Sequence, residues 1–234
     1  TVVGEHVVEP PIAGKPLTLS IDAELSEAMY DIIATATAKA GFRSGAAAIM
    51  DVNTGEILAM ASFPSYDPEV MADGDDTELI KSYNADDRFP FLNKVLGGAY
   101  TPGSIVKPFM AYAALAEHVI SPDKTIVSNG YLLLPNPYDP SHPTKFLDWR
   151  AQGAMTMRTA IAFSSDVYFY IIGGGFEDQK GLGITKIKEY MSKFGFGSKT
   201  GIILSGEQEG TVPDPQWKQK VFNDDWRLGD TYHT

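Results

Sequence analysis

The strongest constraint on the fold is a Pro-Gly pair followed directly by Ser104 and, three residues later, by Lys107 and another proline. Proline and glycine interrupt regular structure, so we expect a helix to begin at about Ser104. The second proline fits the first turn of a helix, where amide hydrogens lack intrahelical partners. Residues three apart lie on one helix face, so the amine can reach the hydroxyl.

This pairing has a chemical and a purely structural interpretation. A serine is a weak nucleophile until a base removes its proton, and a lysine can be that base where its pKa is lowered by burial or nearby cations. Ser104 would also lie at the positive end of the helix dipole, which favours developing negative charge. The pattern alone is common, however, and without further context it more often marks a helix start with a solvated lysine.

A second motif, Ser164-Ser165-Asp166, lies downstream. A Ser-x-Asn/Asp element after Ser-x-x-Lys belongs to the motif set of serine acyl transferases that bind penicillin. With both motifs, the chain resembles the transpeptidase domain of class B penicillin-binding proteins. Asp166 and the aromatic run after it most resemble the elongation-type members, penicillin-binding protein 2. Further segments that resemble the family are residues 14–22, 48–60, 62–68, 194–202 and 229–231.

The resemblance implies a role for each motif residue. Ser104 would be the nucleophile and Lys107 its base, while Ser164 would carry protons between them and the leaving amine. Asp166 stands where many relatives have asparagine, and this position contacts the lysine and the substrate amide. Ser104, Ser164 and Asp166 would therefore also bind substrate. An ionised Asp166 would favour the charged lysine and oppose base catalysis unless the pair shares its proton, so its protonation stays open.

Residues 199–201 read Lys-Thr-Gly, which is the form of the family's third motif. Their glycine-rich surroundings instead resemble a loop region that the family carries before its true third motif. That motif usually follows a segment like residues 229–231 by many tens of residues. We therefore expect residues 1–234 to be the N-terminal and central part of one transpeptidase domain, without the third motif and the C-terminal strands.

Composition limits the class of protein and its partners. The chain has 234 residues, 44% of them hydrophobic, which is enough for one sizeable core. A net charge of −11 argues against a nucleic-acid partner. No run of apolar residues is long enough to span a membrane, and the chain begins at Thr1 without a signal peptide. We expect a soluble piece of a longer protein, anchored by an absent N-terminal segment at the outer, periplasmic face of the cytoplasmic membrane.

Neither a metal nor a cofactor is expected. Some relatives of penicillin-binding protein 2 bind zinc between the first two motifs, and Asp148 resembles one position of that site. This chain has no cysteine, and residues 152–154 offer no histidine. The histidines are scattered without a close-spaced pair of ligands. They are His6, His118, His142 and His233.

The pattern of residues predicts an α+β fold, and the resemblance implies the penicillin-binding protein and serine β-lactamase-like fold, with helices flanking an antiparallel sheet. Residues 21–40 carry a helical stripe with Asp22 as cap and Gly41 as terminator. The other expected elements are a hairpin of strands 46–52 and 56–61, a surface loop at 64–87, a helix at 107–118, a loop-rich region with short strands at 121–149, a helix at 156–172 broken around 164–166, and a helix at 184–194.

By resemblance, the expected function is peptidoglycan D,D-transpeptidation. Ser104 would attack the carbonyl between two terminal D-alanines of a stem peptide, and an amine of a neighbouring peptide would take the acyl group. Expected partners are stem peptides, β-lactams, which would acylate Ser104, and in the full-length protein a membrane glycosyltransferase and elongation-complex proteins. The alternatives are a D,D-carboxypeptidase or β-lactamase, with water as acceptor, and a non-catalytic scaffold domain of the elongation machinery.

Overall fold

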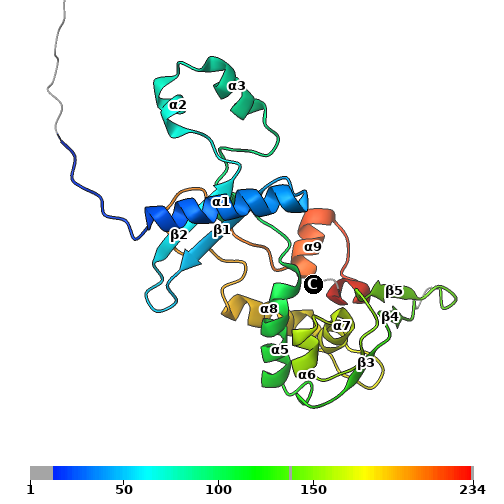
Figure 1. Cartoon of the computed structure of the whole chain (residues 1–234). Helices are drawn as coiled ribbons and strands as arrows, with labels where there is room; N and C mark the ends of the chain where they lie inside the picture. Colours follow the sequence, from blue (N-terminus) through cyan, green and yellow to red (C-terminus); the bar gives the residue numbers. More distant parts are fainter. Residues whose placement is uncertain (1–12, 137–138, 233–234) are drawn as a thin grey trace, which may run out of the picture. The chain divides into compact units, whose positions relative to one another are not determined.

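The structure is a computed structural model that describes residues 13–136 and 139–232. The chain forms two compact units, one up to Gly98 and one from Ala99 onward (Figure 1). Helices and antiparallel strand pairs occur together, which confirms the expected α+β class. Across both described ranges, none of the helices combines the length and apolar character that crossing a bilayer requires.

The first unit is built on helix α1, Ala23–Ala40, which lies along a β-hairpin (Figure 1). The Asp22 side chain accepts a hydrogen bond from the Leu25 amide at 3.0 Å, which caps the first turn. Gly41 ends the helix with a φ of 71°, a left-handed conformation that suits glycine. Both predicted helix ends are confirmed.

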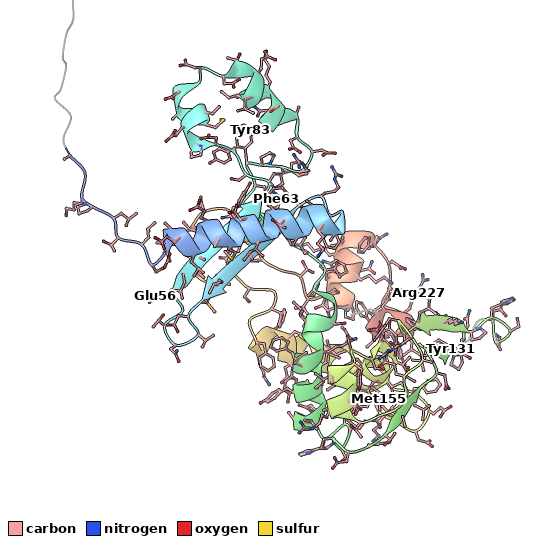
Figure 2. All side chains as sticks on the ribbon, in the orientation of Figure 1. Glu56, Phe63, Tyr83, Tyr131, Met155 and Arg227 are labelled. Atoms are coloured by element: carbon pink, nitrogen blue, oxygen red, sulfur yellow. The ribbon has the colours of Figure 1, made fainter. Side chains whose placement is uncertain are left out.

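The hairpin pairs β1, Gly45–Met50, with β2, Ile57–Phe63, in the predicted antiparallel arrangement. Alternate residues of a strand share one face, and the buried Ala59 and Ala61 on β2 form a small core with Met29 of α1. Phe63, labelled in Figure 2, meets the Tyr30 ring edge-on with 5.7 Å between centroids. This apolar contact holds α1 on the hairpin.

The predicted loop at 64–87 is wrong, because this stretch contains two helices. The Asp67 carboxylate accepts a hydrogen bond from the Glu69 amide at 2.9 Å, and Asp76 accepts one from the Leu79 amide at 2.9 Å. The aspartates that suggest a polar loop are therefore helix N-caps. The helices are α2, Pro68–Asp73, and α3, Thr77–Ala85, and the short α4, Lys94–Gly97, follows them.

The second unit surrounds α7, Asp166–Gly174, which is apolar on nearly all sides. Val167, Tyr168 and Ile172 are at most 1% exposed, as expected for a helix inside a core. Helices α5, α6 and α8 and strands β3, β4 and β5 pack against it. The bounds are α5 Lys107–Ala116, β3 Ile126–Ser128, β4 Tyr131–Leu134, β5 Thr144–Leu147, β6 Gly153–Met155, α6 Met157–Ala162, α8 Gly183–Lys193 and α9 Pro215–Phe222.

The remaining sequence predictions for this unit are confirmed in outline. Short strands occupy the loop-rich region, where β3 pairs with β6 and β4 with β5, both antiparallel. The predicted helix at 156–172 is divided into α6 and α7 around residues 163–165. The sequence did not predict β6, α9 or the final 3₁₀ turn at Leu228–Tyr232.

Gly181 packs closely against the backbone at the end of α7, and a substitution at Gly181 tests this packing. A Cβ at this position would overlap the Gly175 amide nitrogen, and the backbone there cannot move aside as a flexible side chain could. We expect Gly181→Ala to lower the free energy of unfolding by about 1–3 kcal/mol through overpacking. Gly14→Ala, where no atom lies within 4 Å, is the control and should change it by less than about 0.5 kcal/mol. Urea unfolding measures both, and equal stabilities would contradict this packing.

Candidate active site

Ser104 lies in a 3₁₀ turn, Gly103–Val106, that leads directly into α5. Gly103 has a φ of 61°, a left-handed turn conformation that glycine adopts without strain. The predicted helix start is therefore confirmed, with a tighter first turn. Ser104 is exposed, whereas Lys107 is only 7% exposed. The alternative of a solvated lysine is wrong.

The buried Lys107 ammonium group donates three hydrogen bonds to the second motif. Its Nζ lies 2.8 Å from the Ser164 carbonyl oxygen, 3.0 Å from Ser164 Oγ and 2.5 Å from Asp166 Oδ1. A lysine ammonium has three donors and no acceptor, so these contacts use all of them. The Phe169 ring, 5.7 Å from Nζ to its centroid, adds a cation–π contact.

Ser164 stands between the lysine and Ser104. Its Oγ donates a hydrogen bond to Ser104 Oγ at 2.8 Å, so Lys107 is connected to Ser104 through Ser164. Ser164 has a φ of 53°, in the left-handed region that L-residues other than glycine avoid. The structure thus brings together all four residues that the sequence singled out.

A cavity of about 240 Å³ opens beside these side chains. Its lining includes Ser104, Lys107 and Asp166, together with two residues that the sequence analysis did not assign to the site, Tyr170 and Thr231. Burial and the nearby charge of Asp166 raise the pKa of the Tyr170 phenol, which donates to a backbone carbonyl. Tyr170 could have been found, since it follows Asp166 by one helical turn.

The residues considered for zinc do not form a metal site in the described part of the chain, where no group of three potential acidic, histidine or cysteine ligands comes together. Both carboxylate oxygens of Asp148 accept hydrogen bonds from neighbouring amides and side chains. His6 and His233 lie outside the described residues. The expectation that the protein holds no metal stays a prediction.

Lys199 and Thr200 lie on no strand, and neither lines the cavity at Ser104. The Thr200 amide and hydroxyl instead donate hydrogen bonds to the Glu207 carboxylate at 2.7 and 2.6 Å. The threonine hydroxyl that a third motif would offer to a substrate is therefore engaged within its own loop. This geometry agrees with the sequence interpretation of residues 199–201 as a loop.

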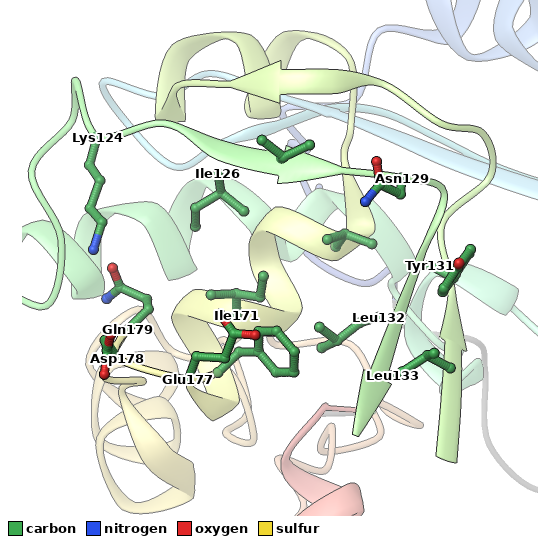
Figure 3. A pocket seen from close by; sticks show the side chains of 13 residues that line it. Lys124, Ile126, Asn129, Tyr131, Leu132, Leu133, Ile171, Glu177, Asp178 and Gln179 are labelled. Atoms are coloured by element: carbon green, nitrogen blue, oxygen red, sulfur yellow. The ribbon is translucent and has the colours of Figure 1, made fainter. Parts of the chain in front are cut away.

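A larger cavity of about 460 Å³ lies elsewhere in the second unit (Figure 3). It is formed between β3, β4 and α7, with Ile171 and Leu132 inside and Lys124 and Asp178 among its polar lining. It contains none of the predicted site residues. We take the smaller cavity as the candidate site, because it lies at the hydrogen-bonded Ser104, Ser164 and Lys107, and a serine becomes reactive only beside a base, whatever the cavity volume.

The backbone of Ser164 can be tested directly. Ser164→Gly and Ser164→Ala both remove the hydroxyl, but only glycine adopts a φ near 53° without strain. A left-handed conformation costs a non-glycine residue about 1–2 kcal/mol, so we expect the glycine variant to be more stable than the alanine variant by about 1 kcal/mol. Urea unfolding of the two variants checks this. An alanine variant as stable as the glycine variant would contradict the left-handed geometry.

Comparison with known proteins identifies the family of this chain. The family described as "Penicillin binding protein transpeptidase domain" matches residues 45–228. The peptidoglycan D,D-transpeptidase MrdA of Haemophilus influenzae is 36% identical over 95% of this chain and 32% of its own length. The MrdA protein of Acinetobacter baumannii is 34% identical over 94% of this chain and 30% of its own. The chain therefore spans about a third of the length of these curated relatives.

Solved structures give the same result. Penicillin-binding protein 2 of Pseudomonas aeruginosa, in complex with WCK 5153, matches with a TM-score of 0.79 at 35% identity, over 95% of this chain and 45% of its own. The Helicobacter pylori protein, solved in complex with MreC, matches with a TM-score of 0.77 at 31% identity, over 91% of this chain and 36% of its own. Because the family match covers most of the sequence, the chain belongs to the penicillin-binding protein transpeptidase family, and its resemblance to penicillin-binding protein 2 is confirmed.

Proposed function

We propose that this chain is part of a serine-type peptidoglycan D,D-transpeptidase. The observation that carries the proposal is the continuous hydrogen-bonded path from Ser104 through Ser164 to the buried Lys107. A nucleophile, a proton carrier and a base in hydrogen-bond reach are the parts that acyl transfer requires. The D,D-transpeptidase names of the curated relatives support the choice of peptidoglycan stem peptides as substrate.

The proposed reaction moves one proton along this path. Lys107 first passes a proton to Asp166 across their 2.5 Å contact, which leaves a neutral amine beside Ser164 Oγ. The two hydroxyls then turn, so that Ser104 donates to Ser164 and Ser164 donates to the neutral amine. Ser104 gives its proton to Ser164 as Ser164 gives its own to Lys107, and Ser104 Oγ forms a bond to the carbonyl carbon while the π electron pair of the carbonyl moves to its oxygen. The carbon–nitrogen bond to the terminal D-alanine breaks, and the proton returns along the path to the leaving amine. An acceptor amine reverses these steps and receives the acyl group.

The proposed site is completed by parts other than Lys199 and Thr200. In the family, a third-motif strand supplies a carboxylate anchor and one amide of the oxyanion hole, and the amide of the nucleophilic serine supplies the other. The loop geometry of Thr200 supports the proposal that this strand comes from outside residues 1–234. The match to the Haemophilus influenzae relative covers only 32% of that protein's length, which supports the same proposal.

The proposal extends to location and partners. Peptidoglycan stem peptides lie outside the cytoplasmic membrane, so we place the protein at its outer face, anchored by a segment outside this chain. The Helicobacter pylori complex with MreC supports a comparable partner for this protein. We also propose a membrane glycosyltransferase and other elongation-complex proteins as partners of the full-length protein. Penicillins would acylate the same serine as substrate mimics.

The nucleophile can be identified with a labelled penicillin and the protein at its natural length. We expect the label on Ser104, because this exposed hydroxyl accepts the hydrogen bond from Ser164 and faces the cavity. Peptide mapping by mass spectrometry locates the label, and Ser104→Ala should abolish it. A label on Ser164, or labelling that persists in Ser104→Ala, would exclude this assignment.

The base can be tested with two matched lysine variants. Lys107→Ala should slow penicillin acylation by about 10²–10⁴-fold, the usual effect of losing a positioned general base. Lys199→Ala removes the lysine of the loop and should leave the rate nearly unchanged. The second-order acylation rate is measured, with the melting temperature as a folding control. A folded Lys107→Ala that reacts like the parent would exclude Lys107 as the base. A slow Lys199→Ala would contradict the assignment of Lys199 to a loop outside the site.

A further inference from the structure

The buried carboxylate of Asp148, only 8% exposed, links segments that are far apart in the sequence. Its Oδ2 accepts hydrogen bonds from Ser128 Oγ at 2.9 Å, Ser165 Oγ at 2.9 Å and the Val167 amide at 3.2 Å. Ser128 ends β3, Asp148 follows β5, and Ser165 and Val167 stand at the start of α7. Asp148 therefore joins two strand ends to the second motif.

Hydrogen bonds from these and two further neighbours occupy the acceptor sites of the Asp148 carboxylate. Its Oδ1 accepts from the Trp149 amide at 2.9 Å and from Gln152 Nε2 at 3.1 Å, so five donors meet a group with about four acceptor sites. Burial raises the pKa of Asp148, but the hydrogen bonds from the amides at the start of α7 and from the serine hydroxyls lower it by more. The pKa of Asp148 therefore lies below its ordinary value. The ionised carboxylate also lies at the positive end of the α7 dipole.

These bonds act on the residues that hold Lys107. Ser165 and Val167 are the neighbours of Asp166, and Ser165 follows the left-handed Ser164 directly. A strained backbone persists only where its surroundings determine it strongly. The carboxylate of Asp148 fixes the two residues around Asp166, and none of its hydrogen bonds goes to Ser104 or Lys107.

We propose that Asp148 is a positioning residue for acyl transfer, which holds the backbone of residues 164–167 so that Ser164 and Asp166 meet Lys107. This role rests on the proposed function for its kinetic readout alone. It gives Asp148, which resembles a zinc-ligand position of some relatives, a role that needs no metal.

The main test is Asp148→Asn in the protein at its natural length. The substitution would place an amide NH₂ group where Oδ2 now accepts from the Val167 amide. A backbone N–H can only donate, so two donors would face each other and this hydrogen bond would be lost. The acylation rate constant at saturating penicillin should fall by at least about 10-fold, since a misplacement of about 1 Å can cost about 10²-fold. The penicillin concentration for half-maximal rate should change little, because Asp148 does not line the cavity.

Asp214→Asn is the matched control. Asp214 is also buried and, like Asp148, does not line the cavity at Ser104, but its hydrogen bonds go to the Trp217 amide, which it caps, and to Lys188, and not to the second motif. We expect both Asp214→Asn and Asp148→Asn to lower the free energy of unfolding. Only Asp214→Asn should keep the acylation rate of the parent.

A second variant acts on the motif only through Asp148. Ser128→Ala removes the donor on β3 and should slow acylation by about threefold, the effect of losing one ordinary hydrogen bond. Added to Asp148→Asn, it should cause no further loss, because both act through the same carboxylate. If Asp148→Asn does not fold, Ser128→Ala alone decides.

The outcomes separate the two proposals. Acylation at the parent's rate in folded Asp148→Asn, or an equal loss in Asp214→Asn, would overturn the positioning role. A parent protein that no penicillin acylates would overturn the proposed function instead. In that case, crystal structures of the parent and Asp148→Asn decide: displaced contacts between Lys107 and Ser164 support the positioning role, and unchanged contacts exclude it.

Discussion

The burial of the Lys107 ammonium group is the interaction on which the rest of the site depends. A cation removed from water costs several kcal/mol unless it is paired and hydrogen-bonded. Here two oxygens of Ser164 and one of Asp166 supply the partners. The start of α5 is thereby joined to the start of α7, whose apolar body lies in the core of the second unit.

The junction separates the exposed Ser104 hydroxyl, the proposed nucleophile, from the buried Lys107 amine, its proposed base. Ser104 remains open to solvent in its 3₁₀ turn, while Lys107 lies beneath it and reaches it through Ser164. Ser164 stands between them in a left-handed conformation, at the short bend where α6 ends and α7 begins. The strain at this bend is therefore part of the geometry that the proposed proton transfer needs.

The sequence predicted best where one local signal determines the structure. Asp22 and Gly41 mark the ends of α1, and the bend between α6 and α7 falls where polar residues interrupt an apolar run. The same reasoning failed at residues 64–87, because an aspartate in a polar stretch can mark a loop or cap a helix. The family motifs predicted the four site residues, but the contacts of Asp148 depend on long-range packing that no local pattern reveals.

The most direct test of this account is a double-mutant cycle of Ser164→Ala and Lys107→Ala, measured as the rate of penicillin acylation of Ser104. If the proton passes from Ser104 through Ser164 to Lys107, the two residues act as a unit, and the double variant should be no slower than the slower single variant. Losses that multiply in the double variant would show that Ser164 and Lys107 act independently, which would contradict the proposed path.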